Sequence, residues 1–125
     1  MPGPIPTEIT YNRESRVLEV AFVSGERFKL SAEYLRVHSP SAEVRGHGPG
    51  QEVLQIGKEN VSIDRIEPVG NYAVRLCFND GHDTGLYSWE ELFKLGRDKE
   101  VLWRRYLERL EAAGHKRAAA PRETS

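Results

Sequence analysis

The histidines and the single cysteine are the side chains of this sequence best suited to bind a metal ion. The cysteine is Cys77, and the histidines are His38, His47, His82 and His115. A structural zinc site takes four Cys or His ligands, usually from two closely spaced pairs. Neither C-x-x-C nor H-x-x-x-H spacing occurs here, so the spacing disfavours a preformed zinc site.

Two interpretations of the histidines stay open. In the first, the segment 37–52 folds over the turn at 79–85 and gathers ligands from His38, His47, His82, and Glu43 or Asp83. In the second, which the spacing favours, all four histidines are exposed and titrate near the ordinary pKa of about 6.5. Cys77 is predicted to be a small buried residue rather than a nucleophile.

The sequence shows no recognisable pattern for nucleophilic catalysis. Ser39, Ser41 and Ser88 have no G-x-S-x-G or Cys–His signature around them, and Ser88 fits a helix cap better. The glycine-rich run 46–50 lacks the lysine of a phosphate-binding loop. No set of residues provides both a nucleophile and a base, so we expect a protein without enzymatic activity.

The composition is that of one small domain from a reducing compartment. The chain has 125 residues, 38% of them hydrophobic and 30% charged. This length suffices for a hydrophobic core without disulfides, which a single cysteine cannot form within the chain. We expect a cytoplasmic protein, because no apolar run approaches a membrane span and the proline-rich start does not resemble a secretory signal.

Charge is distributed unevenly along the chain. Residues 1–93 carry 9 basic and 14 acidic side chains, whereas residues 94–125 carry 9 basic and 5 acidic ones. Acidic residues are interleaved with the basic ones at this end, as on a solvated helix face. We therefore expect neither a nucleic-acid partner nor a membrane partner.

Alternating apolar residues predict strands in the first two thirds of the chain. Residues 1–7 contain three prolines and are predicted to be a flexible leader, because proline fixes φ and donates no backbone hydrogen bond. A hairpin is predicted over 16–30, followed by a short helix capped by Ser31. Residues 37–52 are predicted to form a long loop. Later strands are predicted over 61–68, 72–78 and 83–87.

Helical patterns follow the strands. Ser88 and Glu91 form a capping box, so a helix is predicted to begin there and to end at Gly96 in the left-handed conformation. Asp98 is predicted to cap a second helix that stops near Gly114. Residues 115–125 are predicted to be a disordered tail. The sequence thus predicts one α+β domain over 8–114, with a mainly antiparallel sheet and two C-terminal helices packed on one face.

Two segments resemble a known family. They are Tyr34-Leu35-Arg36-Val37-His38-Ser39-Pro40-Ser41-Ala42-Glu43-Val44 and Asp80-Gly81-His82-Asp83-Thr84-Gly85-Leu86-Tyr87-Ser88-Trp89-Glu90-Glu91-Leu92. The pairing of Leu-Arg with Asp-Gly-His and Tyr-Ser-Trp resembles the N-terminal domain of gamma-butyrobetaine hydroxylase. It resembles more closely the small stand-alone bacterial proteins of that domain family, whose function is not established. The resemblance runs from about Ile9 to Leu95.

The resemblance implies a zinc site built from Cys-x-Cys-x-x-Cys and one later histidine. The cysteine positions of the family hold Ser39, Ser41 and Val44 in this sequence, and the histidine is His82. Hydroxyl and isopropyl groups cannot replace thiolates, so the zinc of the family is not expected here. The iron- and oxoglutarate-dependent catalytic domain of the hydroxylase has no counterpart. Similar domains are also attached to ATPases of the iron–sulfur cluster carrier type, which implies a metal-related context.

Hydrogen bonds are expected to replace the metal of the relatives. Ser39, Ser41 and Glu43 are predicted to bond the His82 imidazole or the amides of Gly81 and Thr84. These bonds would fasten the long loop to the later turn. A loop held in this way opens more readily than one held by a metal.

Two functions are compatible with these features. The first is a non-enzymatic module for a protein partner, with a surface on the 35–44 loop and the 81–85 turn made of Leu35, Arg36, His38, Ser39, Pro40, Ser41, Glu43, Gly81, His82, Thr84 and Gly85. The alternative is a metal-binding accessory protein linked to iron or iron–sulfur metabolism, in which His82 with His38, His47 or carboxylates holds zinc or iron weakly. No other cofactor is expected, and the oligomeric state stays open.

Overall fold

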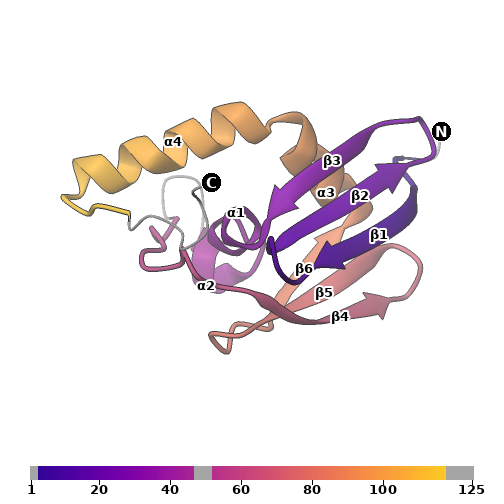
Figure 1. Cartoon of the computed structure of the whole chain (residues 1–125), viewed down its shortest axis with the longest axis horizontal. Helices are drawn as coiled ribbons and strands as arrows, with labels where there is room; N and C mark the ends of the chain where they lie inside the picture. Colours follow the sequence, from indigo (N-terminus) through magenta and orange to yellow (C-terminus); the bar gives the residue numbers. More distant parts are fainter. Residues whose placement is uncertain (1–2, 47–51, 118–125) are drawn as a thin grey trace.

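Two three-stranded antiparallel sheets form one half of the computed structural model, which describes residues 3–46 and 52–117 (Figure 1). The first sheet has the order β1 (Pro6–Asn12), β2 (Val17–Phe22), β3 (Arg27–Ser31). The second has the order β4 (Ile63–Val69), β5 (Ala73–Phe78), β6 (Gly85–Ser88). Both sheets contribute to one core that includes Leu18, Leu30, Ile63, Leu76 and Tyr87.

Four helices complete the fold: α1 (Ala32–Val37), α2 (Ala42–Arg45), α3 (Trp89–Arg97) and α4 (Lys99–Ala112). Helix α3 packs against β3 and β6, and α4 follows it along the top of the view in Figure 1. The predicted α+β class is therefore confirmed, although the strands divide into two sheets. Every helix in the described parts of the chain is too short or too polar to span a bilayer.

Strand β1 is the first difference from the sequence prediction, because it begins inside the predicted leader 1–7. Pro6 lies opposite Phe22, and pairing with β2 continues to Asn12. β1 is an outer strand of its sheet, where a residue without an amide donor can be accommodated. Long-range pairing with β2 thus forms a strand that local sequence does not indicate.

The predicted loop 37–52 contains the short helix α2. The Ser41 side chain caps this helix by accepting a hydrogen bond from the Glu43 amide at 3.2 Å. Val44 anchors it, with 5% of its surface exposed. The rest of the predicted loop, including His47, lies partly outside the described residues.

Gly96 and the Glu91 side chain do not play the parts in α3 that the sequence predicts. Gly96 lies within α3 rather than ending it, and a side chain there would overlap the Phe28 ring. Close packing on β3 therefore requires this glycine. The Ser88 hydroxyl caps α3 by accepting from the Glu91 amide at 3.1 Å, but the Glu91 carboxylate bonds Arg45 instead of completing a capping box.

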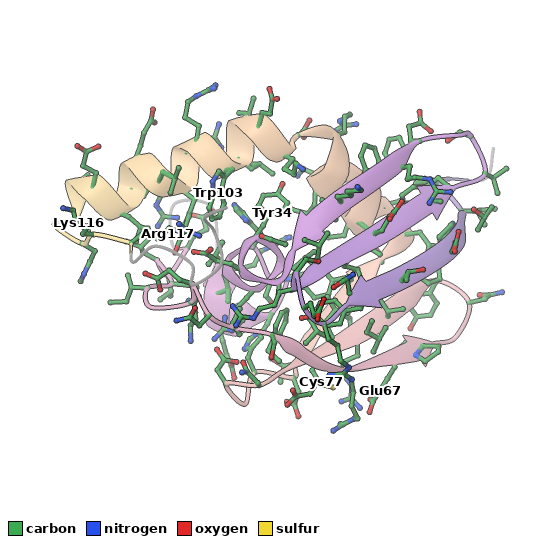
Figure 2. All side chains as sticks on the ribbon, viewed as in Figure 1. Tyr34, Glu67, Cys77, Trp103, Lys116 and Arg117 are labelled. Atoms are coloured by element: carbon green, nitrogen blue, oxygen red, sulfur yellow. The ribbon has the colours of Figure 1, made fainter. Side chains whose placement is uncertain are left out.

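The structure also bears on the predictions for Cys77 and for the end of the chain. Cys77 is buried in β5, as predicted, with the Arg65 guanidinium 3.6 Å from its sulfur (Figure 2). Within the predicted tail 115–125, the structure describes residues 115–117, and Arg117 there is bonded to Glu33. The remainder of that tail lies outside the described residues.

Candidate functional site

A set of side-chain hydrogen bonds fastens the α1–α2 segment to the turn between β5 and β6. We call these five residues the clasp: Ser39, Ser41, Glu43, His82 and Thr84. The Ser39 hydroxyl lies 2.9 Å from Nε2 of His82, and a Glu43 carboxylate oxygen lies 3.0 Å from its Nδ1. The hydroxyls of Ser41 and Thr84 are 2.8 Å apart. The predicted fastening is confirmed, with Thr84 bonding through its hydroxyl rather than its amide.

The chemistry of its partners fixes the tautomer of His82. An ionised carboxylate only accepts hydrogen bonds, so Nδ1 carries the proton and donates it to Glu43. Nε2 then accepts from the Ser39 hydroxyl, whose oxygen also accepts from the Ser41 amide at 3.2 Å. Burial lowers the pKa of His82, and the Arg36 charge lowers it further against the opposing effect of Glu43. His82 is therefore neutral at pH 7.

Local backbone geometry positions the serines of the clasp. Ser39 and Ser41 lie on either side of Pro40, between the end of α1 and the start of α2. Gly85 begins β6 directly beside them, and a Cβ at this position would lie 2.5 Å from the Ser39 hydroxyl oxygen. A glycine is therefore needed here for close approach rather than for an unusual backbone angle.

An ion pair between the buried Arg36 and the partly accessible Asp80 supports the clasp. Arg36 is 7% exposed, and its Nε donates to Asp80 at 2.8 Å while its Nη1 donates to Gln55 at 3.0 Å. Asp80 also accepts from Lys58 at 2.7 Å and from the His82 amide at 3.1 Å. Burial alone would raise the pKa of Asp80, but these donors outweigh it and lower the pKa to about 2. The turn that carries His82 is thus tied to α1 and to the 55–58 segment.

The prediction that all four histidines are exposed is wrong for His38 and His82. His82 is 6% exposed. His38 is half-buried, and its Nδ1 donates to the Tyr34 carbonyl oxygen at 3.0 Å. Its ring lies between the rings of Tyr34 and Tyr106, and burial lowers its pKa. His38 has no part in the clasp, and His47 lies outside the described residues.

The zinc implied by the family does not fit the donor atoms of this site. Two of the four ligand positions hold neutral hydroxyls, and the third holds the buried apolar side chain of Val44. The one remaining donor, Nε2 of His82, is already bonded to Ser39. Among residues 3–46 and 52–117, the structure contains no cluster of three His, Cys, Asp or Glu side chains able to hold a metal ion.

Ser39, His82 and Glu43 have the connectivity of a Ser-His-acid triad, which sequence reasoning missed. The three residues lack a local signature, and only Ser39 and His82 correspond to ligand positions of the family. A nucleophile must reach a substrate, however, and Ser39 has 0% of its surface exposed. Gly85 packs directly against the hydroxyl, because a Cβ there would lie 2.5 Å from its oxygen. The triad connectivity is therefore structural here.

The predicted interaction surface divides into a buried and an exposed part. Its buried members are Leu35, Arg36, Ser39, Ser41, His82 and Gly85. His38 and Pro40 are half-buried, while Glu43, Gly81 and Thr84 are exposed. Ala42 and Asp83 are also exposed beside these three residues in the chain. We call this exposed set the clasp edge: Ala42, Glu43, Gly81, Asp83 and Thr84.

Fold and site together define a small α+β domain in which the α1–α2 segment is fastened to the turn between β5 and β6 through His82. A family described as "Gamma-butyrobetaine hydroxylase-like, N-terminal" matches residues 9–93. The chain belongs to this family.

Solved structures support the same assignment. A protein with an NMR solution structure is 54% identical, with a TM-score of 0.79 over 92% of this chain and 86% of that chain. A crystal structure from Acidithiobacillus ferrooxidans, of a protein with unknown function in the DUF971 family, is 42% identical. Its TM-score is 0.62, and the match covers 73% of this chain and 91% of that chain.

A curated relative is much longer than this chain. The chloroplastic Fe-S cluster assembly factor HCF101 of Oryza sativa subsp. japonica is 31% identical over 80 residues. The match covers 62% of this chain and 15% of that protein, so this chain corresponds to a small part of its relative.

Proposed function

We propose that this chain is a non-enzymatic interaction module that binds a protein partner through the clasp edge. The observation that carries the proposal is the clasp itself. Its hydrogen bonds satisfy the buried polar groups of Ser39 and His82. They also hold two segments that are 43 residues apart in the sequence in a fixed relative position. A surface fixed before binding loses less conformational entropy on association than a flexible one.

The partner is proposed to belong to iron–sulfur cluster assembly. In support, a similar domain occupies 15% of the length of a protein named as an Fe-S cluster assembly factor. A domain of this size has its own hydrophobic core, so it can act as a separate binding unit within a longer protein.

Photo-crosslinking tests the proposed surface. A photoreactive amino acid is placed at Asp83, which is exposed on the clasp edge, and in a control chain at Val23, which is 67% exposed in the β2–β3 turn. We expect the photoreactive residue at position 83 to crosslink a cluster assembly protein that the one at position 23 does not crosslink. Adding Glu43→Lys to the chain labelled at position 83 should reduce the crosslinking yield. Equal crosslinking yields from both positions, or a yield that Glu43→Lys does not change, would contradict the proposal.

The alternative function is a metal-binding accessory protein. The observation in its favour is that the exposed Glu43 carboxylate lies 3.0 Å from the imidazole of the buried His82, which places two potential metal-binding groups side by side. Titration with zinc and with ferrous ions, followed by the NMR signals of the histidines, separates the two functions. Unmoved His38 and His82 signals at stoichiometric metal would exclude the alternative. A His82 change that Glu43→Gln abolishes would favour it.

A further inference from the structure

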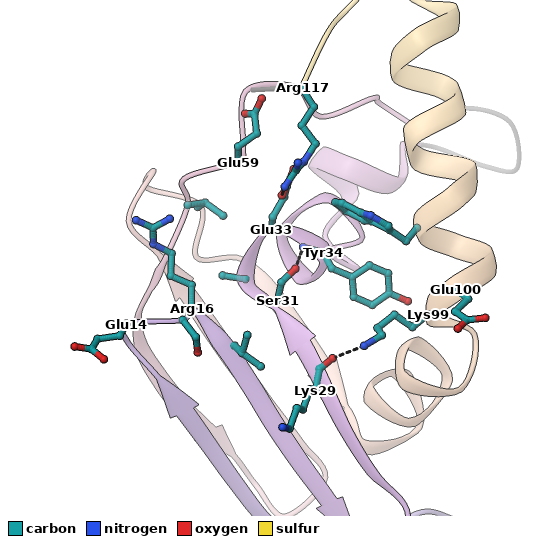
Figure 3. Close-up of a pocket in the computed structure, with 15 residues that line it drawn as sticks. Glu14, Arg16, Lys29, Ser31, Glu33, Tyr34, Glu59, Lys99, Glu100 and Arg117 are labelled. Carbon is teal, nitrogen blue, oxygen red and sulfur yellow. Dashed lines mark hydrogen bonds and ion pairs between the residues drawn. The ribbon is translucent and has the colours of Figure 1, made fainter. Parts of the chain in front are cut away.

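A second candidate site lies away from the clasp, in a cavity of about 560 Å³ (Figure 3). Its walls come from the start of β2, the end of β3, α1, the 59–61 segment and α4. Tyr34 and Trp103 supply aromatic surface, and Glu33 supplies a carboxylate. None of the five clasp residues lines this cavity.

The carboxylate of Glu33 binds a guanidinium group in this cavity. Glu33 is only 6% exposed, and its two oxygens accept from Nε and Nη2 of Arg117 at 2.8 and 2.6 Å. The guanidinium carbon of Arg117 lies 5.5 Å from the centre of a Trp103 ring. Figure 2 shows Arg117 beside Trp103, and Figure 3 shows its side chain directed at Glu33.

These contacts are the ones that distinguish arginine from other side chains. A planar guanidinium matches a carboxylate through two parallel hydrogen bonds, and its face stacks on an aromatic ring. Lysine can supply neither the paired hydrogen bonds nor the planar face. The arrangement is therefore a guanidinium-binding site, and the buried carboxylate would lose its charge partner if no cation were present.

The occupant of the site comes from the segment that follows α4. Helix α4 ends at Ala112, and Gly114 turns the chain with a φ of 80°. Arg117 follows three residues later and keeps 30% of its side chain exposed. The cavity persists beside the bound guanidinium, so a second segment has room to approach. Lys99, at another wall, is bonded to the Lys29 carbonyl and does not compete for Glu33.

We propose that this cavity recognises an arginine side chain of a protein partner, and that Arg117 occupies the site in the free protein. The bound Arg117 then acts as an intramolecular competitor. A partner that presents an arginine has to displace it, so removal of Arg117 increases the affinity of the site for external arginine.

Binding of Nα-acetyl-argininamide to the full chain tests the proposal, with Nα-acetyl-citrullinamide as a ligand of similar shape that lacks the charge. The readout is the indole NMR signal of Trp103, with Trp89 as internal control because its indole bonds the Asn71 carbonyl elsewhere in the fold. We expect Arg117→Ala to bind the arginine compound about tenfold more tightly than the wild type, as loss of a tethered competitor requires. The citrulline compound should not bind either chain.

A double variant identifies the carboxylate as the recognition group. Glu33→Gln keeps the size of the side chain, and in the Arg117→Ala background it should remove arginine binding while the Trp89 signal stays native. Three results would each overturn the proposal. They are an affinity for the arginine compound that Arg117→Ala does not increase, equal binding of the citrulline compound, or arginine binding that persists with Glu33→Gln. The readout at Trp103 is independent of crosslinking at Asp83, so this site and the clasp edge can fail separately.

Discussion

Among single residues, His38 and His82 behave differently from a free histidine because both are withdrawn from water. Burial lowers the pKa of each below the ordinary value of 6.5. For His82, the neutral ring is also the form that accepts from Ser39 while donating to Glu43. Protonation would place a second donor against the Ser39 hydroxyl and a positive charge near Arg36.

This shift predicts a pH dependence of stability. Because the folded pKa of both histidines is lowered, the unfolded chain binds more protons below pH 6.5. The contribution of the two neutral histidines to stability is complete above that pH and is lost as the pH falls. Urea unfolding between about pH 7.5 and about pH 5 should show a falling free energy of unfolding, with NMR titration placing both pKa values below the ordinary one. A constant free energy over this range would contradict the prediction.

Asp80 supports a second prediction at the residue scale. Asp80→Asn removes the charge partner of the buried Arg36 guanidinium, so it should lower the free energy of unfolding by about 2 kcal/mol. Asp83→Asn is the matched control, because Asp83 is exposed in the same turn and should change stability by less than about 0.5 kcal/mol. Chemical denaturation of both variants measures the difference. Equal effects would show that the ion pair does not hold the turn.

Among the elements, features that depend on neighbouring residues were predictable from the sequence, whereas features that depend on long-range contacts were not. The caps of α1 and α3 are confirmed by the hydrogen bonds to Ser31 and Ser88, because capping depends on neighbouring residues alone. Strand β1 depends on pairing with β2, and α2 has only four residues, so neither leaves a clear periodic pattern. The same reason applies to the site. The clasp partners followed from the resemblance. Arg36 and Asp80 also lie in the two segments that carry the resemblance, but nothing in the sequence indicates that these residues, 44 apart, form an ion pair.

Packing between α3 and β3 gives a prediction at the scale of elements. Alanine favours a helix over glycine by up to about 1 kcal/mol, yet Gly96→Ala should destabilise the fold by about 1–2 kcal/mol because its methyl group overlaps the Phe28 ring. A double-mutant cycle measures the cause. In a Phe28→Ala background the same substitution should be neutral or stabilising. A penalty that persists without the Phe28 ring would contradict this explanation.

For the whole molecule, the clasp predicts stability that does not depend on zinc. Wild-type unfolding should be unaffected by added zinc or by a chelator. A variant with Ser39→Cys, Ser41→Cys and Val44→Cys, which keeps His82, should gain a raised midpoint with zinc, because a metal bound by the folded state alone stabilises it. A chelator that lowers the wild-type midpoint would contradict the hydrogen-bonded account of the clasp.

Two of the four outer strands, β1 and β4, have a further consequence for the molecule as a whole. β1 and β4 are each paired on one side only, and each contains a proline: Pro6 opposite Phe22 and Pro68 opposite Val74. An unpaired strand edge is a template on which another polypeptide can add and start aggregation. Proline interrupts that template because it has no amide to donate. Two residues that weaken strand formation therefore protect the β1 and β4 edges against the addition of another strand.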